Sequence, residues 1–112
     1  MYVRLVIQLS YTIAMIKQLE CEIFGRVQMV MFRDFVRRRA IRFNLSGFVE
    51  NTEKGTVKVL AQGEEAKLKQ LFVDLRKGPA LAKVERISEI WSEPVAKYEG
   101  FEIVYRNLLD RL

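Results

Sequence analysis

The chain has 112 residues and is 50% hydrophobic, so it is long enough for one compact core and too short for two ordinary domains. Its 19 lysine and arginine residues outnumber 14 acidic ones, and the net charge of +5 favours anionic partners, whether small phosphorylated molecules or nucleic acid. Histidine is absent and Cys21 is the single cysteine, which excludes an internal disulfide, a Cys/His zinc site and hydrolases built on a Ser-His-Asp or Cys-His arrangement. This cysteine usage fits a reducing compartment, so we expect a cytoplasmic protein.

The first sixteen residues are mostly apolar, but the run is shorter than the roughly 20 residues that cross a bilayer, and polar residues interrupt it. It also lacks the clean apolar centre and the small-residue cleavage site of a signal peptide. We therefore expect no contact with a membrane. We interpret residues 1–14 as an extension of unknown role, either a peripheral element or a segment upstream of a natural start at Met15.

The first regular pattern is an alternation of apolar and polar side chains around Leu19, Cys21 and Ile23, which predicts a strand with one buried face. On that face Cys21 is expected to be a small buried residue and not a nucleophile. After a loop at residues 25–30, apolar side chains recur at helical spacing and predict a first helix that ends near Asn44. Its apolar positions are Phe32, Phe35, Val36, Ala40 and Phe43.

Residues 46–51 and 55–62 form two short segments joined by TEKG, and Gly55 supplies a turn residue, so they predict an antiparallel hairpin. Residues 64–77 then predict a second helix, because early glutamates match the positive end of its dipole and Gly78 begins a Gly-Pro stop. The apolar stripe of this helix consists of Leu68, Leu71, Phe72 and Leu75.

Residues 83–92 mix charged and apolar side chains and end at a Glu-Pro pair, whereas Phe101, Ile103 and Tyr105 alternate after a glycine and predict the closing strand. The resulting order is β-α-β-β-α-β. It predicts an α+β fold, the ferredoxin-like sandwich, in which two helices cover one face of an antiparallel sheet.

The loop between the first strand and the first helix has the features of an anion site. At the start of a helix, unpaired backbone N–H groups point outward and the dipole is positive. Gly25 allows a tight turn, and Arg33 in the first helical turn offers a forked pair of donors. The backbone amides that could form a nest around a phosphoryl group belong to Gly25, Arg26, Val27, Gln28, Met29 and Val30.

Two long stretches of the sequence occur in an order that is typical of one family. GRVQMVMFR at 25–33 resembles the acylphosphatase signature G-x-V-Q-G-V-x-F-R. GFVENTEKGTVKVLAQG at 47–63 resembles the second signature of that family, G-[aromatic]-V-x-N-x-x-x-G-x-V-x-x-x-x-x-G. The similarity continues to Arg106, so we interpret residues 15–106 as an acylphosphatase-like domain and residues 107–112 as a C-terminal tail.

The resemblance implies a hydrolase that cleaves the carboxyl-phosphate anhydride of acyl phosphates. Carried over by motif, Arg33 holds the phosphoryl group and Asn51 orients the attacking water. This chemistry asks mainly for positioning and charge stabilisation, so it is compatible with a chain that has no histidine. We expect no cofactor and no metal, a small acyl phosphate and inorganic phosphate as ligands, and a monomer.

One position departs from the family pattern: Met29 stands where the signature has glycine. A side chain there costs about 1 kcal/mol if the backbone is left-handed, and it could also narrow the pocket. We therefore expect phosphate binding to be retained and turnover to be reduced.

Two other functions compete with this interpretation. Ferredoxin-like sheets also occur in RNA-binding modules, and the basic run at residues 37–42 would suit one, but the predicted third strand has none of the exposed aromatic residues that such modules use. The simplest reading of that run is the exposed face of the first helix. Alternatively, Met29 would suit a catalytically weak or inactive accessory domain that keeps the family fold.

Overall fold

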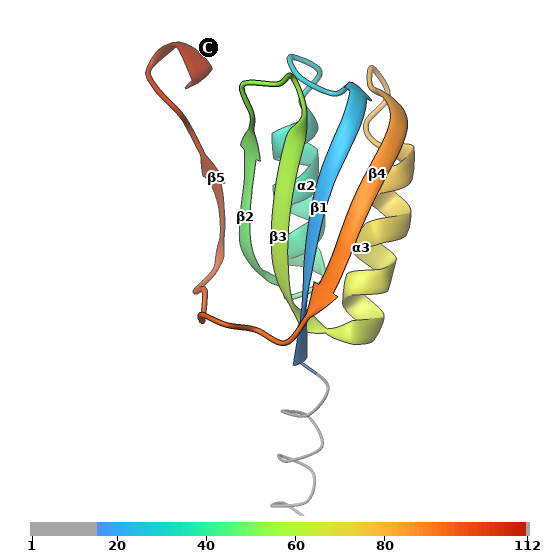
Figure 1. Cartoon of the computed structure of the whole chain (residues 1–112), viewed down its shortest axis with the longest axis vertical. Coiled ribbons are helices and arrows are strands. Elements are labelled where there is room, and N and C mark those ends of the chain that lie inside the picture. The colour runs from blue at the N-terminus through green and yellow to red at the C-terminus, as the bar shows by residue number, and fades with distance from the viewer. Residues whose placement is uncertain (1–15, 112) are drawn as a thin grey trace, which may run out of the picture.

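The computed structural model describes residues 16–111, so the expected extension at residues 1–14 lies outside the described part. Five strands and two α-helices form a two-layer sandwich (Figure 1). In chain order the elements are β1 (Ile16–Arg26), α2 (Phe32–Arg42), β2 (Ser46–Asn51), β3 (Val57–Glu64), α3 (Glu65–Lys77), β4 (Lys83–Ser92), β5 (Phe101–Val104) and a short 3-10 helix, η1 (Leu109–Arg111).

The strand order in the sheet is β4-β1-β3-β2-β5. The first four strands pair antiparallel, with Cys21 of β1 opposite Val59 of β3 on one side and Glu89 of β4 on the other. Both helices cover the same face of this sheet (Figure 1). The predicted ferredoxin-like α+β fold is confirmed.

The core lies between this sheet face and the helices. Leu19, Cys21 and Ile23 are almost completely buried, as the alternation in β1 predicts. Each helix contributes side chains from one apolar stripe. A fully buried valine, leucine or phenylalanine side chain stabilises the fold by about 1.5–3 kcal/mol. These helical core residues are Phe32, Val36, Ala40, Leu68, Leu71 and Leu75.

The second predicted helix is confirmed almost to the residue, since α3 spans Glu65–Lys77. Gly78 ends it with a φ of 67°, a left-handed value that suits glycine, and its N–H donates to the carbonyl oxygen of Asp74 at 2.9 Å. The first helix is shorter than expected and stops at Arg42, two residues before Asn44, which has a φ of 59°.

The prediction that Phe101, Ile103 and Tyr105 form the closing strand of the sandwich is wrong. The strand in that place is a different one. It is β4, residues 83–92, in which Ile87 and Trp91 lie opposite Ile23 and Leu19. β4 is an edge strand and much of it stays exposed, so its alternation is diluted by charged residues. The segment after Gly100 forms the additional strand β5, which pairs parallel with β2 and makes the sheet mixed, and Tyr105 lies just beyond it.

None of the described helices is long and apolar enough to cross a membrane.

Candidate functional site

The loop that the sequence predicts as a phosphate cradle is shorter than expected, because β1 continues through Gly25 and Arg26. Gly25 has a φ of 129°, and a Cβ atom there would lie 2.2 Å from the carbonyl oxygen of Lys83 in β4. The pairing of β1 with β4 shifts register at this residue. Gly25 is therefore required for the close approach of two strands.

The connecting loop comprises residues 27–31, and two of its side chains anchor it in the hydrophobic core. The side chains of Val27 and Val30 are buried in the core, 1% and 9% exposed. Met29 and Met31 both have left-handed backbone conformations, with φ of 61° and 65°. Buried valines thus alternate with exposed methionines, and the tight backbone carries the chain from β1 into the first turn of α2.

The conformation of Met29 explains why a glycine suits this position. The side chain is 98% exposed, so the energetic cost of a non-glycine residue here comes from the left-handed backbone. Met29→Gly is expected to raise the free energy of unfolding by about 1 kcal/mol, measured by urea denaturation. Met29→Ala keeps the Cβ atom and is the matched control, so an equal gain from both substitutions would contradict this explanation.

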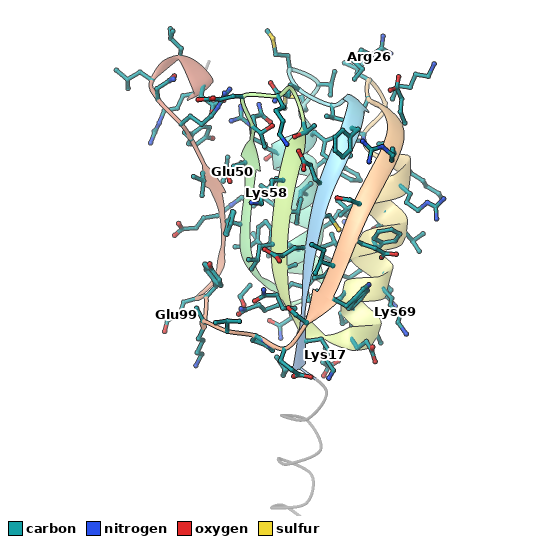
Figure 2. The ribbon with its side chains drawn as sticks, viewed as in Figure 1. Lys17, Arg26, Glu50, Lys58, Lys69 and Glu99 are labelled. Atoms are coloured by element: carbon teal, nitrogen blue, oxygen red, sulfur yellow. The ribbon has the colours of Figure 1, made fainter. Side chains whose placement is uncertain are left out.

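A hollow of about 590 Å³ opens above this loop, and both candidate catalytic residues line it. Arg33 enters it from the first turn of α2, and Asn51 from the last residue of β2. Val27, Gln28 and Met29 also line the hollow, whereas Gly25, Arg26 and Val30 do not. Figure 2 shows Arg26 on the β4 side of the molecule, away from the C-terminal segment.

Gln28 ties the loop to the β2–β3 hairpin. Its side-chain amide nitrogen donates to the backbone carbonyl oxygens of Thr52 and Thr56, each at 2.9 Å. Thr52 directly follows Asn51 in the chain. The position of the loop relative to Asn51 is therefore fixed by two hydrogen bonds from one side chain.

A second set of hydrogen bonds closes the hairpin turn. The hydroxyl group of Thr56 donates to the Glu22 carboxylate at 2.7 Å and lies 2.6 Å from the hydroxyl oxygen of Thr52. Because Thr56 gives its only hydroxyl proton to the carboxylate, Thr52 must be the donor in the shorter contact. The hydrogen bond from Thr56, together with the nearby charge of Lys54, lowers the pKa of the Glu22 carboxyl against the opposing effect of burial.

Asn51 has an unusual environment. The residue is 6% exposed, and its side-chain oxygen Oδ1 is buried without a hydrogen-bond partner among residues 16–111. A buried polar atom of this kind costs about 1–3 kcal/mol, and native proteins usually avoid it. Asn51 lines the hollow, so its side chain brings to this site an acceptor that no described residue uses.

Arg33 already has a partner on the other side of the hollow. Its Nη1 donates to Oδ1 of Asp110 and its Nη2 to the backbone oxygen of Asp110, both at 2.9 Å. The guanidinium carbon also lies 5.1 Å from the ring centre of Tyr105. Six residues from Tyr105 onward line the hollow and were not expected there from the sequence: Tyr105, Arg106, Asn107, Leu109, Asp110 and Arg111. No local pattern marks them, because the contact spans 77 positions of the chain.

The Asp110 carboxyl is 4% exposed. Burial acts to raise its pKa, but the N–H of Arg106 and the guanidinium groups of Arg33 and Arg106 outweigh it, so the pKa lies below its ordinary value. A carboxyl of this kind binds fewer protons in the folded chain than in the unfolded chain. Its contribution to stability is complete above its ordinary pKa and is lost as the pH falls through the lowered value.

We expect the acid sensitivity of folding to reflect this carboxyl and that of Glu22. The free energy of unfolding should decline from about pH 4.5 downward, because the pKa values of Asp110 and Glu22 are both lowered. Asp110→Asn and Glu22→Gln should each flatten the decline in urea denaturation between pH 6 and pH 3. Glu102→Gln, at an exposed position of β5, is the control, and a decline of unchanged steepness in both test variants would refute the assignment.

Cys21 does not line this hollow. It is 2% exposed in the core, and burial raises the pKa of its thiol to about 12, which leaves it protonated at neutral pH. The expectation that it is a buried structural residue is confirmed. In the part of the chain that the structure describes, no cluster of three cysteine or acidic side chains could hold a metal ion.

Comparisons of this chain by family model, by sequence and by structure each include acylphosphatases. The family model described as Acylphosphatase matches residues 19–103. The acylphosphatase of Salinibacter ruber is 39% identical over 87 residues, which cover 78% of this chain and 92% of the relative, and that of Dehalococcoides mccartyi is 41% identical over 88 residues, covering 78% and 97%. The crystal structure of acylphosphatase from Bacillus subtilis superposes with a TM-score of 0.78 at 36% identity and covers 80% of this chain and 99% of that one. The chain belongs to the acylphosphatase family.

Proposed function

We propose that this protein hydrolyses acyl phosphates to a carboxylate and inorganic phosphate in the hollow between α2 and β2. The observation that carries the proposal is the shared lining: Arg33 at a helix N-terminus and Asn51, whose Oδ1 has no hydrogen-bond partner among the described residues, line one cavity. The first N–H groups of α2 have no acceptor within the helix, so they add donors beside the guanidinium. Donors for a phosphoryl group and an acceptor for water are thereby placed together.

In the proposed reaction the guanidinium of Arg33 and amides of the 27–31 loop hold the phosphoryl oxygens. Oδ1 of Asn51 accepts a hydrogen bond from a water molecule and aims the water oxygen at phosphorus. The new bond forms between the water oxygen and phosphorus, while the bond between phosphorus and the acyl oxygen breaks. The carboxylate leaves with the electron pair, and a water proton passes to the phosphate product or to solvent.

The leaving group explains why the hollow needs no strong acid. A carboxylate has an ordinary pKa near 4, so it departs as a stable anion without being protonated. Catalysis then depends on charge stabilisation by fixed donors, which the helix terminus and the guanidinium provide. A site without histidine suffices for such a reaction.

The exposure of Met29 favours an enzyme over an inactive accessory domain. Its side chain is 98% exposed, so it does not fill the hollow. We also propose a monomeric cytoplasmic protein that does not bind nucleic acid. The sheet face opposite the helices carries the carboxylates of Glu20, Glu22 and Glu50, which repel a phosphate backbone; Glu50 lies across from Lys58 on this face (Figure 2).

The direct test is hydrolysis of benzoyl phosphate without added metal, followed by its ultraviolet absorbance. We expect saturable turnover that inorganic phosphate inhibits competitively, that a chelator leaves unchanged and that varies little between pH 6 and 8. Absence of turnover in the folded protein would favour the accessory domain, and loss of activity with a chelator would contradict the proposed chemistry.

A further inference from the structure

Residues 105–111, here called the strap, lie over the candidate site at the end of the molecule that also carries the β2–β3 hairpin (Figure 1). Both terminal nitrogens of the Arg33 guanidinium donate to Asp110, one to the carboxylate and one to the backbone oxygen. Two oxygens of one acidic residue thus occupy the forked edge of the guanidinium. This is the edge at which arginine binds two oxygens of a phosphoryl group.

The strap is folded so that the carboxylate of Asp110 is held in place. Its second oxygen, Oδ2, accepts from the backbone N–H of Arg106 at 2.9 Å, and the side-chain oxygen of Asn107 accepts from the N–H of Asp110 at 3.0 Å. The carboxylate is 4% exposed and Arg33 is 20% exposed, so water screens the ion pair only weakly. A negative charge is therefore fixed inside an anion site.

The strap is held by polar contacts and buries little apolar surface. Leu108 and Leu109, its two leucines, are 82% and 77% exposed. Detaching residues 106–111 while Tyr105, which is 37% exposed, stays beside Arg33 therefore exposes little new hydrophobic area, and the main loss is the pair of Asp110 with Arg33. The family match ends at residue 103, so the strap follows the segment that this chain shares with the family model.

We propose that Asp110 is an intramolecular competitor of the phosphoryl group and sets the affinity of the site for phosphate and substrate. This inference rests on the proposed function. A carboxylate and a phosphoryl group cannot share the same two donors, and their like charges repel in a weakly screened hollow. The strap must leave Arg33 before a phosphoryl group can bind the forked edge of the guanidinium. The apparent affinity for phosphate is therefore lower by the free energy needed to displace the strap.

The test compares inorganic phosphate binding to the full chain and to Asp110→Asn by isothermal titration calorimetry. Removing the carboxylate charge should tighten phosphate binding by about tenfold. In benzoyl phosphate hydrolysis KM should fall by a similar factor while kcat stays the same, because the strap is displaced in the bound complex of both proteins. Asp110→Ser is a second variant that also removes the charge, and circular dichroism confirms that each variant is folded.

Glu102→Gln is the matched control, since it removes one acidic charge from exposed β5 without touching Arg33. Equal tightening in this control would overturn the proposal in favour of a general charge effect. Unchanged binding in Asp110→Asn would overturn it as well. Weaker binding with a lower kcat would show instead that Asp110 positions Arg33 for catalysis.

Displacement can also be observed in the unmodified chain by nuclear magnetic resonance. The carboxyl carbon of Asp110, whose oxygen accepts from Arg33, should shift toward a solvent-exposed value in proportion to phosphate saturation. Phosphate binding that leaves this carboxyl resonance unchanged would overturn the proposal. If phosphate displaces the strap but no variant hydrolyses benzoyl phosphate, the competitor role stands and the proposed enzymatic function fails, so the two failures are distinguishable.

Discussion

Arg33→Ala should reduce kcat/KM for benzoyl phosphate by about 10³-fold, the largest effect expected for a single substitution in this protein. The guanidinium is the only arginine side chain that α2 contributes to the hollow within the described residues, and it offers forked donors at a positive helix end. Both phosphate affinity and kcat should fall, because the same donors bind the ground state and the transition state. Steady-state kinetics with phosphate as an inhibitor would measure both.

Two comparison variants separate charge from geometry. Arg33→Lys keeps the charge but loses the planar fork, so it should recover only a small part of the activity. Arg37→Ala removes the same charge from an exposed position of the same helix and should change kcat/KM less than twofold. Comparable losses at both positions would mean that α2 acts through its overall charge and that Arg33 has no special role.

Asn51→Ala should reduce kcat by about 10²-fold while the inhibition constant of phosphate stays nearly unchanged. Asn51 is proposed to act on water, so its loss should affect the chemical step and spare phosphoryl binding. This split distinguishes it from Arg33, whose loss should affect both. A variant that loses phosphate affinity and keeps kcat would show that the asparagine binds the phosphoryl group.

The stability of Asn51→Ala provides an independent check. Oδ1 of Asn51 is buried without a partner, so removing it should cost little and could be neutral in urea denaturation. Glu50→Ala, at the neighbouring position of β2, is the control for activity. A large loss of stability in Asn51→Ala would indicate that the amide group holds the fold together, and the kinetic effect would then need another explanation.

The sequence was sufficient for features whose cause is local. The second helix was predicted nearly to its ends because its apolar stripe and glycine stop lie within one short segment. Arg33 and Asn51 come from two motifs that each lie within one short segment, and both line one cavity, while their catalytic roles stay a prediction.

Features that depend on distant partners could not be predicted in the same way. Gly25 looked like a loop residue, but its role is set by the backbone of Lys83, which only the strand pairing brings near. The identity of β4 depends on its register with β1, because an edge strand shows a weak alternation. Asp110 contacts Arg33, which lies 77 positions earlier in the chain, and the residues next to Asp110 show no pattern that predicts this contact.

The parallel pairing of β5 with β2 has a consequence for how the protein opens. β5 has four residues, and it joins segments far apart in the chain, so it should be among the first elements to separate in native-state hydrogen exchange. Its separation would uncover the hydrogen-bonding edge of β2 and carry residues 105–111 away with it. We expect amides of β5 to exchange faster than those of β1 and β3, and the guanidinium of Arg33 to become accessible through the same fluctuation while the core stays folded.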